Sequence, residues 1–90
     1  MLYAVICKDK PDSGALRDAT RPTHLKYLEA GGPVFSGPML GEDEKTPIGS
    51  LLIVEAPDRA AIEAWAANDP YAKAGLFATV EIRPFRKVIG

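Results

Sequence analysis

One histidine and two arginines stand at spacings that would bring them together on a helix. The chain contains a single histidine, His24, and Arg17 and Arg21 precede it in the stretch "LRDATRPTH". Residues at i, i+4 and i+7 share one face of an α-helix. An imidazole can accept and return a proton near neutral pH, and arginine can hold an anionic group through two hydrogen bonds. The pattern therefore indicates a candidate acid–base group beside two candidate anion-binding groups, and a solvated helix face would give the same spacing.

A candidate partner for the imidazole lies in "NDPYAKAGL", residues 68–76. Asp-Pro commonly begins a helix, with Asp as the N-cap and Pro at the first helical position. One oxygen of Asp69 could accept a backbone N–H while the other meets His24, so capping and catalysis do not exclude each other. Tyr71 would point toward the same region or pack in the core. Nearby cations would favour the neutral form of the imidazole, whereas a nearby Asp would favour its charged form. The spacing of the residues does not decide between these two effects.

Most other chemical signatures are missing from the sequence. There is no phosphate-binding glycine loop and no nucleophile elbow, and one His with one Cys cannot form a dense nitrogen or sulfur metal cluster within a single chain. The net charge of -1 predicts no attraction to nucleic acid or to an anionic membrane. Cys7 cannot form an internal disulfide, and the N-terminal apolar run ends at Lys8, too early for a membrane span. We expect a cytoplasmic protein without a metal site.

The hydrophobic pattern predicts four strands and two helices in one domain, residues 1–90. The strands are expected at 2–8, 34–40, 49–56 and 78–88, and the helices at 15–30 and 57–69, with one further helical turn over 70–75. Pro22 either kinks the first helix or separates a short turn at 14–19 from a helix capped by Thr20. The inward stripe of that helix is expected to be Leu16, Thr20, Thr23, Tyr27 and Ala30.

The order β-α-β-β-α-β predicts an α+β fold of the ferredoxin-like type, with a four-stranded antiparallel sheet and two helices on one face. The first strand is apolar on both faces, because Leu2, Ala4 and Ile6 alternate with Tyr3, Val5 and Cys7. Two helices cover only one face of such a sheet, so the other face is expected to pack on a second copy of the chain. A partly exposed apolar sheet in a monomer is the alternative.

These segments together resemble the YciI-like (YCII-related) family along essentially the whole chain. The resemblance is carried by the Arg-x-x-x-Arg-x-x-His helix, the "GSLLIVEA" strand start and the "DPYAKAGL" turn, in that order. It implies a dimeric α/β barrel in which two ferredoxin-like units pack sheet to sheet. It also implies an active site built around His24 and Asp69, with Ser36 of "FSGPM" as a weaker match near the pocket.

The resemblance favours a small cofactor-independent enzyme, of the lyase, isomerase or dehydrochlorinase type, that acts on a small cyclic or aromatic acid. His24 would move a proton, Asp69 would orient it, and Arg17, Arg21, Ser36 and Tyr71 would bind the substrate. The alternative is a non-enzymatic dimer that binds a small anionic ligand in the same pocket, and a dimer with a vestigial pocket is a third interpretation.

Overall fold

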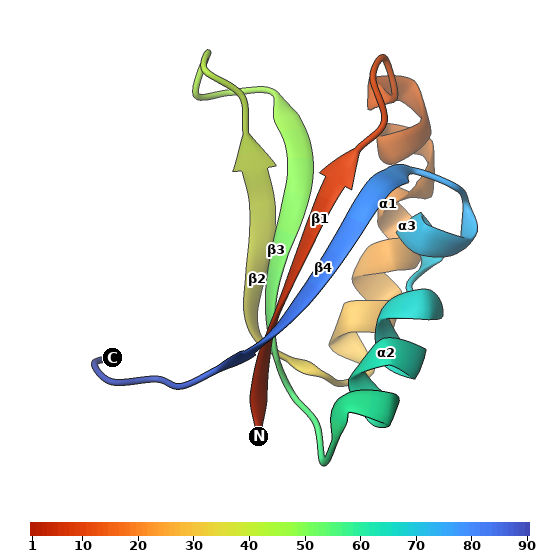
Figure 1. Ribbon diagram of the computed structural model, residues 1–90. Helices are drawn as coiled ribbons and strands as arrows, with labels where there is room; N and C mark the ends of the chain where they lie inside the picture. The colour runs from red at the N-terminus through yellow and green to blue at the C-terminus, as the bar shows by residue number, and fades with distance from the viewer.

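The computed structural model describes residues 1–90, and its helices all cover the same face of one antiparallel sheet (Figure 1). This is the α+β, ferredoxin-like arrangement that the sequence predicts. The elements, in chain order, are β1 (Leu2–Asp9), α1 (Gly14–Glu29), β2 (Pro33–Leu40), β3 (Pro47–Glu55), α2 (Arg59–Ala67), α3 (Pro70–Lys73) and β4 (Phe77–Phe85).

The sheet has the strand order β2-β3-β1-β4, so the two central strands are the two most apolar segments of the chain. In the central register, Val5 of β1 lies opposite Leu52 of β3 and Ile82 of β4. Because side chains alternate along a strand, these residues share the face that the helices cover. The core between sheet and helices consists of Tyr3, Val5, Cys7, Leu52, Val54, Ala56, Ile62 and Ala66.

The first helix is continuous from Gly14 to Glu29 with Pro22 inside it, so the alternative with a separate turn and Thr20 as cap is wrong. A proline in a helix leaves the carbonyl four residues earlier without its usual donor. Here that carbonyl belongs to Asp18, and both Asp18 and Pro22 are exposed, so water can supply the missing hydrogen bond.

The inward face of α1 is not the stripe that hydrophobicity predicted. Leu16 is 38% exposed, and Thr23 and Ala30 are exposed too, whereas the two buried residues of the helix are Arg17 and His24. Of the predicted stripe, only Thr20 and Tyr27 are partly buried. The prediction failed because it assumed that apolar side chains face inward. A charged side chain can be buried when an oppositely charged or hydrogen-bonding partner contacts it in the interior.

The two later helices follow the sequence closely. Asp58 caps α2 by accepting a hydrogen bond from the backbone N–H of Ala61 at 2.8 Å, and Ile62 and Ala66 of this helix are buried. The predicted turn after α2 is the short helix α3, which begins at Pro70 and is followed by Gly75 in the left-handed region at φ 79°. These caps place the Asp69 segment beside α1.

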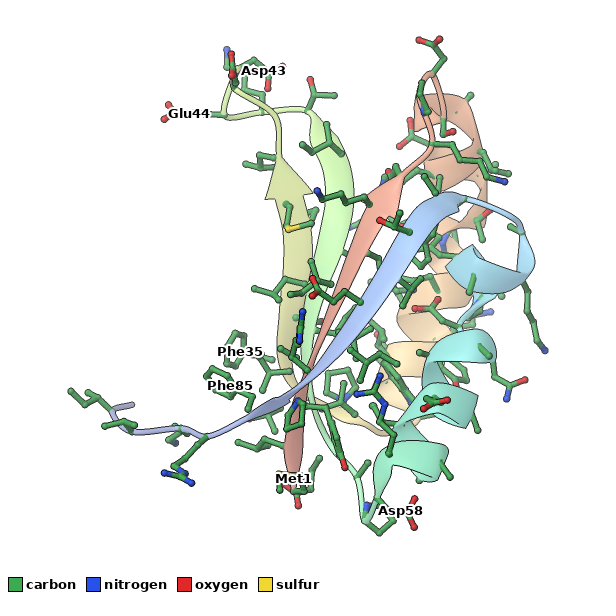
Figure 2. All side chains as sticks on the ribbon, in the orientation of Figure 1. Met1, Phe35, Asp43, Glu44, Asp58 and Phe85 are labelled. Atoms are coloured by element: carbon green, nitrogen blue, oxygen red, sulfur yellow. The ribbon has the colours of Figure 1, made fainter.

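The face of the sheet opposite the helices, which we call the open face, carries apolar side chains of all four strands. By register and alternation it includes Leu2, Ala4, Ile6, Phe35, Leu51, Ile53 and Phe85. Figure 2 shows Phe35 and Phe85 on this side of the sheet, away from the helices, and they are 61% and 41% exposed. The two-faced apolar pattern predicted for the first strand is therefore present, and no helix covers the open face.

Candidate active site

The single imidazole lies against a carboxylate from the far end of the chain. The Nδ1 atom of His24 is 2.7 Å from Oδ1 of Asp69, and both side chains are buried. A carboxylate at this distance fixes Nδ1 as the hydrogen-bond donor, which leaves Nε2 without a proton in the neutral ring. The pair can therefore act as a general base through Nε2, with Asp69 holding the tautomer.

The carboxylate is fixed by the local sequence around it. Asp69 is the N-cap of α3, and its Oδ1 accepts a hydrogen bond from the backbone N–H of Tyr71 at 2.9 Å. Pro70, at the first helical position, has a backbone dihedral that its ring presets. The sequence suggested that different oxygens would serve the cap and the imidazole, but one oxygen accepts both hydrogen bonds. The same oxygen of Asp69 therefore caps α3 and orients the ring of His24.

Tyr71 lies between the imidazole and Arg17. Its ring stacks on that of His24, with the ring centres 3.8 Å apart and the planes 14° from parallel. The Arg17 guanidinium carbon lies 4.8 Å from the centre of the Tyr71 ring, within range of a cation–π interaction. Burial raises the pKa of the Tyr71 phenol against the opposing charges of Arg17 and Arg21, so its hydroxyl is protonated at neutral pH.

Arg17 is held by residues from two strands. Its Nε and Nη2 atoms donate to the two carboxylate oxygens of Asp9 at 2.7 and 3.0 Å, and Nη2 also donates to Oγ of Ser50 at 2.9 Å. Burial acts to lower the pKa of Arg17, but hydrogen bonding and charge from Asp9, with a further contribution from Tyr71, raise it. The buried guanidinium of Arg17 is therefore charged, and the carboxylate of Asp9 balances this charge.

Asp9 and Ser50 are site residues that sequence reasoning missed. Asp9 is two residues beyond Cys7, so strand alternation places it on the helix face, and this signal was available. Ser50 follows Gly49, where a Cβ atom would lie 2.3 Å from the backbone oxygen of Cys7. Only glycine fits there, and the close approach of β1 and β3 aligns Ser50 with Cys7 on the side of Arg17.

A cavity of about 430 Å³ opens beside the imidazole, between α1 and the strands β2 and β3. Leu25, Leu28 and Leu52 form part of its apolar lining. Its polar lining consists of Arg17, Asp18, Arg21, His24, Ser36, Ser50 and Tyr71. An enclosure of this size suits a single small ring.

Five of the six predicted site residues line this cavity: Arg17, Arg21, His24, Ser36 and Tyr71. The sixth, Asp69, lies behind the imidazole rather than on the cavity wall. Ser36 is an exposed residue of β2, paired in register with Leu52, and it reaches the cavity from the side opposite α1. The structure thus brings all six together, and their roles stay predictions.

Cys7 lies close to the site but is not suited to nucleophilic chemistry. Burial, together with the charges of Asp69 and Asp9, raises the pKa of its thiol to about 12. At neutral pH the reactive thiolate is therefore almost absent. No group of three or more His, Cys, Asp or Glu side chains is gathered where it could hold a metal ion. No helix has the length and apolar character that crossing a membrane requires.

Comparison with known proteins assigns the family. Residues 1–86 match the model of the YCII-related domain, and the chain belongs to this family. It is 38% identical over 97 aligned residues to Protein YciI of Escherichia coli O6:H1, an alignment that covers 98% of this chain and 99% of that protein. It is 35% identical over the same aligned length to an uncharacterized protein of Haemophilus influenzae, with the same coverage of both chains.

A solved structure of an enzyme is similar over nearly the whole fold. It is 5-chloro-2-hydroxyhydroquinone dehydrochlorinase (TftG) from Burkholderia phenoliruptrix AC1100, in complex with 2,5-dihydroxybenzoquinone. The TM-score is 0.87 at 35% sequence identity, and the match covers 96% of this chain and 94% of that one. In that enzyme, the same fold therefore binds a small ring compound.

Proposed function

We propose that this protein is a cofactor-independent acid–base enzyme that acts on a small cyclic or aromatic acid, with His24 as the catalytic base and acid. The observation that carries the proposal is the buried hydrogen bond of 2.7 Å between His24 and Asp69 beside a cavity. A buried imidazole with a fixed tautomer and an open nitrogen is the arrangement that general base catalysis requires.

The reaction class that fits is an elimination or isomerisation started by proton removal. In a dehydrochlorination of a chlorinated hydroquinone, one hydroxyl proton first moves to the ring carbon that bears chlorine, which gives a keto tautomer with an sp³ C–Cl carbon. Nε2 of His24 then takes the proton of a second ring hydroxyl, and the electron pair of that O–H bond forms a C=O bond. The adjacent ring double bond shifts toward the chlorine-bearing carbon, and chloride leaves with the electrons of the C–Cl bond, so the net loss is HCl and the product is a quinone. In an isomerisation, His24 returns the proton to a different atom. Neither reaction transfers electrons to another molecule, so neither needs a redox cofactor.

The similarity to TftG supports the first of these reactions and supplies a substrate for the test. Purified protein is given 5-chloro-2-hydroxyhydroquinone, and chloride release is followed against the spontaneous rate in buffer. We expect the wild type to accelerate release and His24→Asn to lose about 10²–10⁴-fold of that acceleration. The matched control is Lys26→Gln, an exposed change on the same helix, which should leave the rate unchanged.

Two results would contradict the proposal. Full activity of His24→Asn would remove the imidazole from the chemistry. Saturable binding of ring acids by the wild type, without turnover of this substrate or of related lactones and phenols, would favour the alternative function of a small-ligand-binding protein. Binding is read by thermal shift and turnover by mass analysis of the products, so the two functions give different signals.

We also propose that two copies pack through the open face to form a homodimer. The support is the apolar surface of this face, where Phe35 and Phe85 are exposed. Exposed apolar patches of this kind mark interaction sites, and association of identical chains is most often two-fold. Light scattering should give a mass near two chains, and Phe35→Asp should shift it toward one. A wild-type mass near one chain would contradict the dimer.

A further inference from the structure

Two arginines of α1 reach the cavity, but they differ in the state of their charge. Arg17 is 6% exposed, and its charge is matched by Asp9 through two hydrogen bonds. With the bond to Ser50, three of its five N–H groups are already in use. Arg17 can still donate a hydrogen bond from its other nitrogen, but it offers a ligand no uncompensated charge.

Arg21 is in the opposite state. It is exposed and lines the cavity, and its side chain forms no hydrogen bond or ion pair within the chain. Its charge acts on the phenol of Tyr71 in the direction that lowers the Tyr71 pKa, which places the cation on the same side as the reactive rings. Arg21 precedes His24 by three residues, so their Cβ atoms are about 5–6 Å apart on the helix. Arg17 lies two turns from His24, about 10 Å along the axis.

One further charge faces the cavity. Asp18 lies on its rim, exposed, and forms no ion pair with Arg21. Its carboxylate repels an incoming anion. A second negative charge on a ligand would be repelled by Asp18 and would gain little from Arg17, because Asp9 already neutralises the charge of Arg17. The cavity is therefore suited to one negative charge, placed at Arg21.

We propose that Asp9 is a specificity-determining residue. By neutralising Arg17, it leaves Arg21 as the residue that binds an anion, so the cavity selects small monoanions. The charged oxygen of such a ligand lies about one helical turn from the ligand atom that contacts His24. The inference rests on the proposed function, since it takes the cavity beside His24 as the ligand site.

The test compares two probes by calorimetric titration without any turnover. The first is 2-hydroxybenzoate, a monoanion, and the second is benzene-1,3-dicarboxylate, whose two charges could meet both arginines. The wild type should bind the monoanion more tightly. Arg21→Met should weaken monoanion binding by about tenfold or more, the size of one charge-assisted hydrogen bond, and Asp18→Asn should strengthen it.

Asp9→Asn should shift the preference toward the dicarboxylate by about tenfold, because it frees the charge of Arg17. This variant leaves a buried cation unpaired and can fail to fold. The double variant Asp9→Asn with Arg17→Met removes both charges, and it should keep the monoanion affinity within about threefold of wild type. Unfolding followed by the fluorescence of the single tryptophan, Trp65, identifies variants that fold.

Three results would overturn the inference: no binding of either probe by the wild type, unchanged monoanion binding in Arg21→Met, or loss of monoanion binding in the folded double variant. The last two would make Arg17 the anchor. Because binding is measured without turnover, a missing turnover with the predicted selectivity intact would contradict only the proposed function. Turnover with the wrong selectivity would contradict only the role of Asp9.

Discussion

Two substitutions of Asp69 separate its role as a helix cap from its role as a charged partner of His24. Asn retains a side-chain oxygen that can accept from the backbone N–H of Tyr71, and Asn caps helices about as well as Asp. Ala removes the oxygen and leaves two buried donors, the Tyr71 N–H and the His24 Nδ1–H, without their acceptor.

The magnitude follows from these two hydrogen bonds. Loss of an N-cap costs about 0.5–2 kcal/mol, and a buried donor without a partner costs about 1–3 kcal/mol. Asp69→Ala should therefore lower the free energy of unfolding by about 2–4 kcal/mol. Asp69→Asn should lower it by no more than about 1–2 kcal/mol while losing most of the turnover, because the charge that stabilises the imidazolium is gone.

Urea unfolding followed at Trp65 measures both variants. This residue is the only tryptophan of the chain, and it packs on Tyr27 rather than on His24. Its signal reports global unfolding without direct influence from the substituted site. Equal destabilisation by Ala and Asn would refute the assignment of the Asp69 oxygen to both the cap and the imidazole.

Three further predictions follow from the neighbouring contacts. Gly49→Ala should destabilise the fold by about 2 kcal/mol or more in urea unfolding, because its Cβ would meet the backbone oxygen of Cys7, whereas Gly37→Ala, with open space, should cost less than half as much. Cys7 should stay unmodified by a thiol reagent at pH 8 until the protein is unfolded, and rapid labelling of the native protein would contradict its burial. The pKa of the Cys7 thiol is raised to about 12 in the folded protein, so as the pH rises the unfolded chain loses this proton first. The contribution of Cys7 to the free energy of unfolding should therefore fall between about pH 9 and 12. In urea unfolding at increasing pH, Cys7→Ala should lose less stability over this range than the wild type.

The sequence predicted the framework because its strongest signals are local. The run from Leu2 to Lys8 and the run around Leu52 are apolar on both faces, and the Asp-Pro pair of Asp69 has a capping function that needs no tertiary context. His24 stood out because it is the single histidine and lies at helical spacing from Arg17. These features depend on neighbours within one element.

The orientation of α1 could not be predicted in the same way. Hydrophobicity placed Leu16 inward, but the helix buries Arg17 and His24, since Asp9 and Asp69 meet them from β1 and from the cap of α3. Those carboxylates are 8 and 45 residues away in sequence. The polar face of α1 can be buried only because these distant carboxylates contact it. The periodicity of residues within α1 does not reveal such partners.

The most direct test of an imidazole oriented by Asp69 is the tautomer of His24, observed by ¹H–¹⁵N NMR of the wild type at a pH where the ring is neutral. Because the chain has one histidine, the ring signals belong to His24, and the couplings to the two ring C–H protons distinguish Nε2 from Nδ1. In the neutral form of the ring we expect the proton on Nδ1, hydrogen-bonded to Asp69, and Nε2 without a proton; Asp69→Asn should reduce this preference. A proton on Nε2 in the neutral wild-type ring, or equal populations of the two tautomers, would contradict a base oriented by Asp69.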